Sequence, residues 1–253
     1  MKRVIPLLSG FMVALTGCSV PEGPTMVAHR GGALVYPESS AEAFEAVAKT
    51  DFPIEMDLRA LEDGTLVPLH DATVDRTMTG IAGEPEDISI AEWRSATVQH
   101  PVDGAHGTPI TWDEIAAKYG RDHVLVPEIK DSNIDLDSFA KSILDRKIEG
   151  NVIAQSFDYT VAKDLADAGL NVLYLLSPDQ EIDPPEVVSD GISYVGPNKD
   201  VGGASIAAMK EAGLTVWPWT VNDPVEAVLL LEAGADGVFT DDPWMLADAL
   251  RVE

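Results

Sequence analysis

The stretch VIAQSFDYTVAKDLADAGLNVLYLL, residues 152–176, contains one full unit of the pattern that decides the fold. Its two apolar runs, Val152–Gln155 and Val172–Leu176, have the length of buried strands. Between them, apolar residues recur at helical spacing over Tyr159–Ala168. A strand, a helix and a second strand in this order predict a βα unit whose two strands are parallel.

The same alternation runs through most of the chain. Strands are predicted at Met26–His29, Ile54–Leu58, Val124–Ile129, Val152–Gln155, Val172–Leu176, Ile192–Val195, Thr215–Trp219 and Gly237–Thr240. Helices are predicted at Ala41–Lys49, Leu136–Lys147, Tyr159–Ala168, Gly203–Glu211, Pro224–Glu232 and Pro243–Leu250. Eight such units in about 230 residues fit a closed (β/α)8 TIM barrel, with a doubly wound open sheet as the alternative.

One further strand-like segment, Thr65–His70, does not fit this count. Residues 59–64 separate it from the strand Ile54–Leu58, which leaves too little chain for a crossover helix. The same residues include Asp63-Gly64, a hairpin signal. We therefore expect an antiparallel strand that returns His70 over the mouth of the barrel.

An insertion is predicted after this hairpin, over about residues 72–110, as part of a single domain that spans residues 26–253. It is rich in glycine, proline and acidic residues, with one short helix expected at Ile90–Ser95. The helix Trp112–Tyr119, which begins after the N-cap Thr111, then resumes the barrel.

The N-terminus carries the pattern of an export signal. Lys2 and Arg3 precede the apolar run Val4–Thr16, which is too short to span a bilayer. Leu-Thr-Gly-Cys at residues 15–18 resembles the lipobox of bacterial lipoproteins, whose cysteine is lipidated after cleavage. We predict a signal peptide over residues 1–17, a lipidated Cys18 and a tether over residues 18–25; a plain signal peptide is the alternative. The protein would then be exported and anchored by lipid to the membrane of a bacterial cell envelope.

The composition excludes several partners. The chain of 253 residues has 17 Lys and Arg against 43 Asp and Glu, which gives a net charge of −26. Such a surface repels nucleic acid and anionic membranes, so we expect no nucleic-acid partner and membrane contact only through the lipid anchor. The single cysteine, Cys18, excludes an intrachain disulfide and a thiolate zinc cluster.

Acidic residues gather on the predicted strands, near the ends that carry catalysis in (β/α)8 barrels. Glu55 and Asp57 are two residues apart on one strand and point to the same side, and Glu128 lies on another strand. Three carboxylates in one small space repel each other, and a hard divalent cation relieves that repulsion. The pattern predicts one cation with oxygen ligands, Ca²⁺ or Mg²⁺. Outward-facing carboxylates, or ion pairs with Arg59 and Lys130, are the alternative.

Two histidines also follow predicted strands. His29 ends the first strand and His70 ends the antiparallel one, which suits a general acid–base pair. Arg30 and Lys130 add cations, and an arginine side chain binds phosphate oxygens in a bidentate fashion. Together with a metal ion, these groups suit the chemistry of a phosphate ester. The alternative for Arg30 is an ion pair with Glu38, which is compatible with phosphate binding. The remaining histidines are expected to be structural or exposed: His100, His106 and His123.

Short motifs follow one another over nearly all of the chain after the tether: Ala28-His29-Arg30-Gly31, Pro37-Glu38-Ser39, Glu55-Met56-Asp57, His70-Asp71, Asp75-Arg76-Thr77, Glu128-Ile129-Lys130, Gln155-Ser156-Phe157, Trp219-Thr220-Val221-Asn222, and Asp236-Gly237 to Thr240-Asp241. In this order they resemble the glycerophosphodiester phosphodiesterase family. The resemblance implies a (β/α)8 barrel with a small insertion after the second strand. It also implies hydrolysis of glycerophosphodiesters to glycerol 3-phosphate and an alcohol, with a small-molecule phosphodiester as the partner.

The resemblance further implies roles for individual residues: an acid–base pair of His29 and His70, metal ligands Glu55, Asp57 and Glu128, phosphate contacts Arg30 and Lys130, and an aromatic wall, Trp219. The alternative for Trp219 is a place in the core beside Trp217. Ser39-Ser40 stand where the family usually has Asn-Thr, and we expect Ser39 to cap the following helix.

Two other functions stay open at this point. One is a lysophospholipase D-like phosphodiesterase, and the other is a non-catalytic lipoprotein that binds glycerophosphodiesters. As cofactor we expect one divalent cation, and export favours Ca²⁺ over Mg²⁺ because Ca²⁺ is abundant outside cells.

Overall fold

The computed structural model describes residues 23–100, 102, 104–178 and 180–251. The predicted signal peptide and the predicted lipidation site, Cys18, lie outside these residues. Within them, every helix is too short or too polar to cross a membrane.

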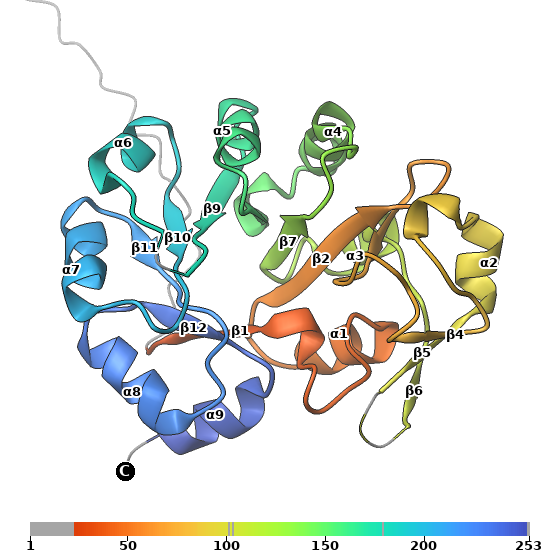
Figure 1. The fold of residues 1–253 in the computed structure, drawn as a ribbon, viewed down its shortest axis with the longest axis horizontal. Helices are drawn as coiled ribbons and strands as arrows, with labels where there is room; N and C mark the ends of the chain where they lie inside the picture. Colours follow the sequence, from red (N-terminus) through yellow and green to blue (C-terminus); the bar gives the residue numbers. More distant parts are fainter. Residues whose placement is uncertain (1–22, 101, 103, 179, 252–253) are drawn as a thin grey trace, which may run out of the picture.

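A ring of eight parallel strands forms the centre of the described part of the chain (Figure 1). The strands are β1 (Thr25–Ala28), β2 (Ile54–Ala60), β7 (Leu125–Ile129), β8 (Ile153–Ser156), β9 (Asn171–Leu175), β10 (Tyr194–Gly196), β11 (Thr215–Val216) and β12 (Gly237–Thr240). Their order is β11-β10-β9-β8-β7-β2-β1-β12. The ring closes where Asp236 N donates to Val216 O and Phe239 N donates to Pro218 O, both at 2.9 Å. The barrel prediction is confirmed, and the open doubly wound sheet is excluded.

The prediction of a strand at Thr215–Trp219 was wrong at its C-terminal end, because β11 ends at Val216. Pro197 and Pro218 have no N–H, so the ladder between β10 and β11 loses donors there. Trp219 N still donates to Pro197 O at 3.0 Å. The chain therefore stays beside β10 and carries Trp219 to the carboxyl end of the barrel.

Helices surround the strands (Figure 1). They are α1 (Ala41–Val47), α3 (Trp112–Tyr119), α4 (Leu136–Arg146), α5 (Tyr159–Asp167), α6 (Pro184–Ser189), α7 (Gly203–Glu211), α8 (Pro224–Glu232) and α9 (Pro243–Leu250). The predicted cap of α3 is confirmed, since Thr111 Oγ1 accepts from Glu114 N and the Glu114 side chain accepts from Thr111 N. Helix α6 was not predicted, because it is short and begins with two prolines that show no helical period.

The cap of α1 differs from the prediction. Ser40, not Ser39, is the N-cap, and its Oγ accepts from Ala43 N at 3.2 Å. Ser39 instead has a φ of 58° and a buried Oγ that makes no hydrogen bond in the described structure. This left-handed conformation suits asparagine better than serine, which gives a physical reason for the asparagine usual at this position.

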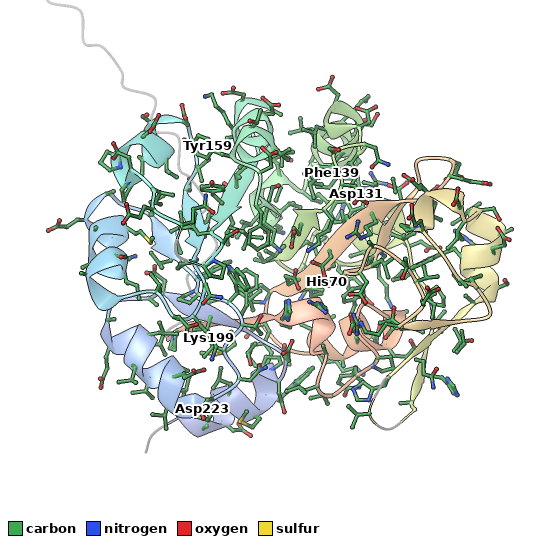
Figure 2. All side chains as sticks on the ribbon, in the orientation of Figure 1. His70, Asp131, Phe139, Tyr159, Lys199 and Asp223 are labelled. Carbon is green, nitrogen blue, oxygen red and sulfur yellow. The ribbon has the colours of Figure 1, made fainter. Side chains whose placement is uncertain are left out.

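A hairpin interrupts the βα pattern after β2. Strand β3 (Leu66–Pro68) pairs antiparallel with β2, as predicted, and the following His70 lies on the β2 side of the ring (Figure 2). The insertion then forms the predicted helix α2 (Ile90–Ser95) and a small antiparallel sheet that was not predicted. The sheet consists of β4 (Met78–Thr79), β5 (Thr97–Gln99) and β6 (His106–Gly107). Strands of this length show no apolar alternation in the sequence.

Apolar side chains fill the barrel on both sides of its wall. A large cluster lies between the strands and the helices and includes Phe44, Leu58 and Phe139. A smaller cluster fills the inside of the ring: Val27, Val126, Ile153, Leu173, Leu175, Trp217 and Phe239. The inner cluster is an apolar floor, so polar residues at the carboxyl ends of the strands stand at one mouth of a closed barrel.

The opposite, N-terminal mouth contains a cavity of about 1040 Å³. It is lined by the first residues of several strands, among them Thr25, Asn171 and Thr215, and by Gly23 and Pro24. The chain therefore enters the barrel at the mouth that lies opposite the carboxyl ends of the strands.

Candidate active site

The turn after β1 positions the first two predicted site residues. It is a 3-10 turn, η1 (His29–Gly31), in which Arg30 has a φ of 51°. The next residue, Gly31, has a φ of 78°, and a Cβ there would lie 2.8 Å from the Cβ of Ala43 in α1. The position of Gly31 is therefore both left-handed and crowded, and it requires glycine. The turn brings His29 and Arg30 into the wall of the cavity at the barrel mouth, and Arg30 N donates to Glu55 Oε2 at 2.6 Å.

Three carboxylates meet beside this turn. Glu55 and Asp57 lie on β2, and Glu128 lies directly opposite Asp57 on the neighbouring strand β7. Each offers one oxygen atom, and these atoms all lie within 4.8 Å of one another. All three residues are buried, with exposed fractions of 2, 1 and 6%. The structure thus brings together the three residues predicted as metal ligands.

Burial is the largest influence on these carboxyls. Together with the charge of Asp57, it raises the pKa of Glu55 to about 7 and the pKa of Glu128 to about 9. For Asp57 the effect of burial is outweighed by Lys130 and Arg30, so its pKa is lowered. Near neutral pH the group therefore carries fewer than three negative charges unless a further cation joins it.

The donor set fits a hard divalent cation. Ca²⁺ and Mg²⁺ prefer oxygen ligands, and the three side chains offer only carboxylate oxygens. Asp57 Oδ2 is buried and accepts no hydrogen bond in the described structure; Arg30 Nε lies 3.4 Å from it. Gln155 Nε2 donates to Glu55 Oε1 at 3.0 Å, which fixes that side chain. A bare buried carboxylate oxygen beside two other carboxylates is an arrangement that a metal ion would complete.

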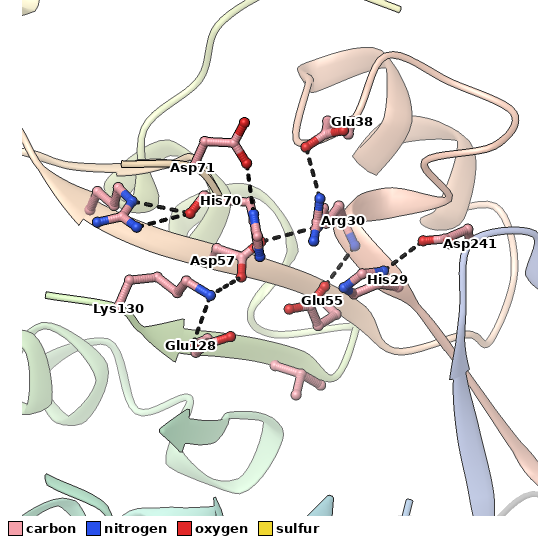
Figure 3. A network of polar contacts seen from close by, with 12 residues as sticks. His29, Arg30, Glu38, Glu55, Asp57, His70, Asp71, Glu128, Lys130 and Asp241 are labelled. Atoms are coloured by element: carbon pink, nitrogen blue, oxygen red, sulfur yellow. Dashed lines mark hydrogen bonds and ion pairs between the residues drawn. The ribbon is translucent and has the colours of Figure 1, made fainter. Parts of the chain in front are cut away.

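His29 is held by a carboxylate from the last βα loop (Figure 3). Its Nδ1 lies 2.6 Å from Asp241 Oδ1, and Asn222 Nδ2 donates to the other oxygen of Asp241 at 2.7 Å. A carboxylate only accepts, so Nδ1 carries the proton and Nε2 is left for a ligand. Burial lowers the pKa of His29, but the hydrogen bond to Asp241 and the charge of Glu55 raise it above its ordinary value.

His70 has a similar partner in different surroundings. Its Nδ1 lies 2.8 Å from Asp71 Oδ1 (Figure 3). Asp71 is itself paired with a cation, since Arg76 Nε donates to its other oxygen at 2.6 Å. Burial lowers the pKa of His70, and the cations Arg30 and Lys130 act in the same direction, so that the opposing effects of Asp57 and Asp71 are outweighed.

Two cations complete the polar side of the site. Lys130 Nζ lies 3.0 Å from Glu128 Oε1 and 3.3 Å from Asp57 Oδ1. Arg30 NH1 donates to Glu38 Oε1 at 3.2 Å, which is the ion pair foreseen as compatible with phosphate binding. Both cations line the same cavity as the histidines and carboxylates, so the alternative of outward-facing carboxylates is wrong, whereas the alternative ion pair with Lys130 is present at Asp57.

The other side of the cavity is apolar. Trp219 and Phe157 stand edge to face with ring centroids 5.3 Å apart, and Trp219 Nε1 donates to Gly196 O at 2.7 Å. Trp219 lines the cavity, whereas Trp217 belongs to the floor inside the ring. The cavity has a volume of about 110 Å³, which suits a small ligand. The larger cavity at the N-terminal mouth contains neither His29 nor His70.

Further polar residues at the site had no predicted role, among them Asp71, Gln155, Asn222 and Asp241. Asp241 directly follows β12, so the strand-end rule that found the other residues also covers it. Asp71 comes directly after His70, at the end of the hairpin. The three histidines expected to be structural or exposed line no part of this cavity. His100 is buried, with its Nε2 3.2 Å from Ala33 O, and His106 is exposed.

Comparisons with known proteins show what the chain as a whole is similar to. A family model, that of the Glycerophosphoryl diester phosphodiesterase family, matches residues 29–245. A glycerophosphodiester phosphodiesterase of Caldanaerobacter subterraneus subsp. tengcongensis is 28% identical over 242 residues, covering 89% of this chain and 97% of the relative. A glycerophosphodiester phosphodiesterase of Bacillus subtilis is 26% identical and covers 88% and 85%.

Solved structures show the same fold. A glycerophosphodiester phosphodiesterase of Thermotoga maritima superposes with a TM-score of 0.74 at 22% identity, covering 89% of this chain and 97% of that one. A phosphodiesterase of Oleispira antarctica, in complex with the product sn-glycerol-3-phosphate, gives a TM-score of 0.75 at 21% identity over 90% and 97%. With the family match over nearly the whole barrel, the chain belongs to the glycerophosphoryl diester phosphodiesterase family.

Proposed function

We propose that the protein hydrolyses glycerophosphodiesters to glycerol 3-phosphate and an alcohol at the cavity described above. One observation carries the proposal: two histidines, each held by a carboxylate, flank three buried carboxylates and two cations in one small cavity. The Oleispira antarctica phosphodiesterase, with sn-glycerol-3-phosphate bound on the same fold, supports this product. Arg30 and Lys130 are proposed to contact the phosphate, and Trp219 to face the glycerol.

The two histidines are proposed to divide the proton transfers. Asp241 holds His29, and its only further side-chain partner in the described structure is the neutral amide of Asn222, so its charge favours a protonated imidazole. The charge of Asp71 is compensated by Arg76, so His70 is more readily neutral. We assign His70 the proton of the attacking hydroxyl group or water, and His29 the delivery of a proton to the leaving alcohol.

We propose that one divalent cation, Ca²⁺ rather than Mg²⁺, binds between Glu55, Asp57 and Glu128. Without it, Arg30 and Lys130 are both paired with the carboxylate of Asp57, which leaves less positive charge for a phosphodiester. When bound, such an ion supplies positive charge that stabilises the phosphate oxygens. The buried Asp57 Oδ2, which accepts no hydrogen bond in the described structure, supports this assignment.

A release assay with a panel of diesters tests the function. Glycerophosphocholine and glycerophosphoethanolamine should yield glycerol 3-phosphate, and His29→Ala or His70→Ala should lower kcat by about 10²–10⁴-fold, because each removes a proton transfer. His106→Ala, a change at an exposed histidine of β6, is the control and should keep wild-type turnover. Binding of the diesters without turnover would favour the non-catalytic alternative, and preferential cleavage of lysophospholipids would favour the lysophospholipase D-like one.

Chelation tests the cation. EDTA should abolish turnover, Ca²⁺ should restore it better than Mg²⁺, and Ca²⁺ should raise the Tm, because a ligand that binds only the folded state stabilises it by about 2.7 kcal/mol at 100 times Kd. Glu128→Gln should lose this Tm response. Asp137→Asn, at an exposed position in the first turn of α4 and outside the cavity, should keep it. Full activity after thorough chelation would contradict the metal assignment.

We also propose that the protein is exported and lipid-anchored through Cys18, which the sequence Leu-Thr-Gly-Cys supports. Labelled palmitate should be incorporated into the wild-type chain in a bacterial host and not into Cys18→Ser. Incorporation into both, or into neither, would contradict the anchor.

A further inference from the structure

Arg76 lies in the insertion just before β4 and makes two forked ion pairs. Its NH1 and NH2 donate to the two carboxylate oxygens of Glu38 at 2.7 and 2.8 Å. Its Nε and NH2 donate to the two oxygens of Asp71 at 2.6 and 3.1 Å. A guanidinium can grip two carboxylates in this way, whereas an ammonium cannot.

Each of the two carboxylates also contacts a residue of the site. Asp71 Oδ1 lies 2.8 Å from His70 Nδ1, and Glu38 Oε1 accepts from Arg30 NH1 at 3.2 Å (Figure 3). Arg76 is thus the central link of a continuous chain from His70 to Arg30. These two residues come from different segments, the β3 hairpin and the turn after β1. Strand β2 contacts both, since Arg59 donates to His70 O and Glu55 accepts from Arg30 N, so the chain through Arg76 is a second connection outside the barrel wall.

The burial along this chain separates it from an ordinary surface ion pair. The Arg76 side chain is 40% exposed, but that of Glu38 is only 8% exposed and accepts hydrogen bonds from two arginines. A buried carboxylate that loses one of two cationic partners must be compensated by the other. Without Arg76, Glu38 would draw on Arg30 alone, and Asp71 would lose the group that orients it toward His70.

We propose that Arg76 is a positioning residue for hydrolysis, which holds His70 through Asp71 and Arg30 through Glu38 at a fixed separation across the phosphate site. The inference rests on the proposed function. It gives the insertion a part in catalysis, although Arg76 itself lines no wall of the cavity.

A double-mutant cycle tests the proposal. Arg76→Ala should lower kcat/KM by about 10–100-fold, because misplacing a catalytic group by an ångström costs that much. Combined with His70→Ala, the total loss should fall about tenfold short of the product of the two single losses, because Arg76 acts through His70. Guanidinium ion should restore part of the Arg76→Ala activity, and Arg76→Lys should restore little.

The matched control is Arg94→Ala on the same insertion. Arg94 pairs with Glu114 at 3.1 Å and its side chain is 60% exposed, so activity should stay at the wild-type level. The proposal would be overturned if the losses of kcat/KM in the two single variants multiplied in the double variant, or if Arg76→Ala lost no activity. A lower Tm of Arg76→Ala without loss of activity would count against it in the same way.

A spectroscopic measurement separates this proposal from the proposed function. The imidazole N–H resonance of His70, identified by its absence in His70→Ala, should shift or broaden in Arg76→Ala and stay unchanged in Arg94→Ala. If the wild-type protein cleaves no diester of the panel, the proposed function fails, and this resonance still decides whether Arg76 positions His70. An unchanged resonance in Arg76→Ala would overturn the positioning role.

Discussion

His29 and His70 show how neighbouring residues can place one side-chain type in two different electrostatic surroundings. Both direct Nδ1 at a carboxylate, Asp241 for His29 and Asp71 for His70. The difference lies one residue further out, where Asp241 meets an amide and Asp71 meets a guanidinium. The predicted strand ends located the two histidines. The contacts of Asp241 with His29 and Asn222 could not be predicted, because a short sequence motif does not show which distant side chains meet in the fold.

The pH dependence follows from these surroundings. The pKa of His70 is lowered below 6.5, so the neutral base forms as the pH rises through that pKa. The pKa of His29 is raised above 6.5, so the protonated acid is lost as the pH rises through that higher pKa. We therefore expect kcat/KM to follow a bell-shaped profile with one limb on either side of pH 6.5.

Asp241→Asn checks the assignment of the upper limb. The variant removes the charged acceptor that raises the pKa of His29, so this limb should move to lower pH while the lower limb stays in place. Asp248→Asn is the control, since its side chain is 77% exposed and pairs with Arg251 at the end of α9. A shift of the lower limb alone in Asp241→Asn would reverse the roles of the two histidines.

At the scale of elements, the sequence predicts the repeated strands and helices of the βα units but not the shortest strands and helices. The βα period, the antiparallel hairpin and helix α2 follow from hydrophobic spacing and turn residues, and the structure confirms them. The sheet β4-β5-β6 and helix α6 are too short to show a period. The regular part of β11 ends early because prolines remove donors, a local effect that an apolar run conceals.

Close packing of β1 against β12 gives a prediction at this scale. Thr25 pairs with Gly237, and a Cβ on Gly237 would lie 2.2 Å from Thr25 O, so the two strands must separate in Gly237→Ala. The expected cost is about 1–3 kcal/mol, which lowers the Tm by about 2–4 °C per kcal/mol. Activity should be kept, because Gly237 lies at the N-terminal end of its strand.

Gly150→Ala is the control for this change. A Cβ there meets no atom within 4 Å, so calorimetry should find a Tm close to that of the wild type. A Gly237→Ala protein as stable as the wild type would mean that β1 and β12 can separate without cost, which contradicts the tight register.

At the scale of the whole molecule, a strongly negative chain gathers positively charged side chains at one mouth of the barrel. The chain has a net charge of −26, yet Arg30, Lys130, His29 and His70 gather at one mouth. The composition alone argues against an anionic substrate, and only the arrangement of the strand ends resolves the conflict. Family membership of the whole chain could be predicted from the order of its motifs, whereas the head group of the substrate depends on loops without a readable pattern.

With the proposed lipid on Cys18, the place where the chain enters the barrel would decide which molecules reach the site. Gly23 lies at the N-terminal mouth, and five residues of chain reach at most about 18 Å from it to Cys18. A lipid on Cys18 would hold that mouth against the bilayer and point the catalytic mouth toward the aqueous compartment. The active-site mouth would then face away from the anchoring membrane. The enzyme would take substrates that diffuse through the aqueous compartment and not lipids of that membrane. Bound to vesicles, it should hydrolyse soluble glycerophosphocholine and leave lysophosphatidylcholine of the same vesicles intact; cleavage of that lipid would contradict this orientation.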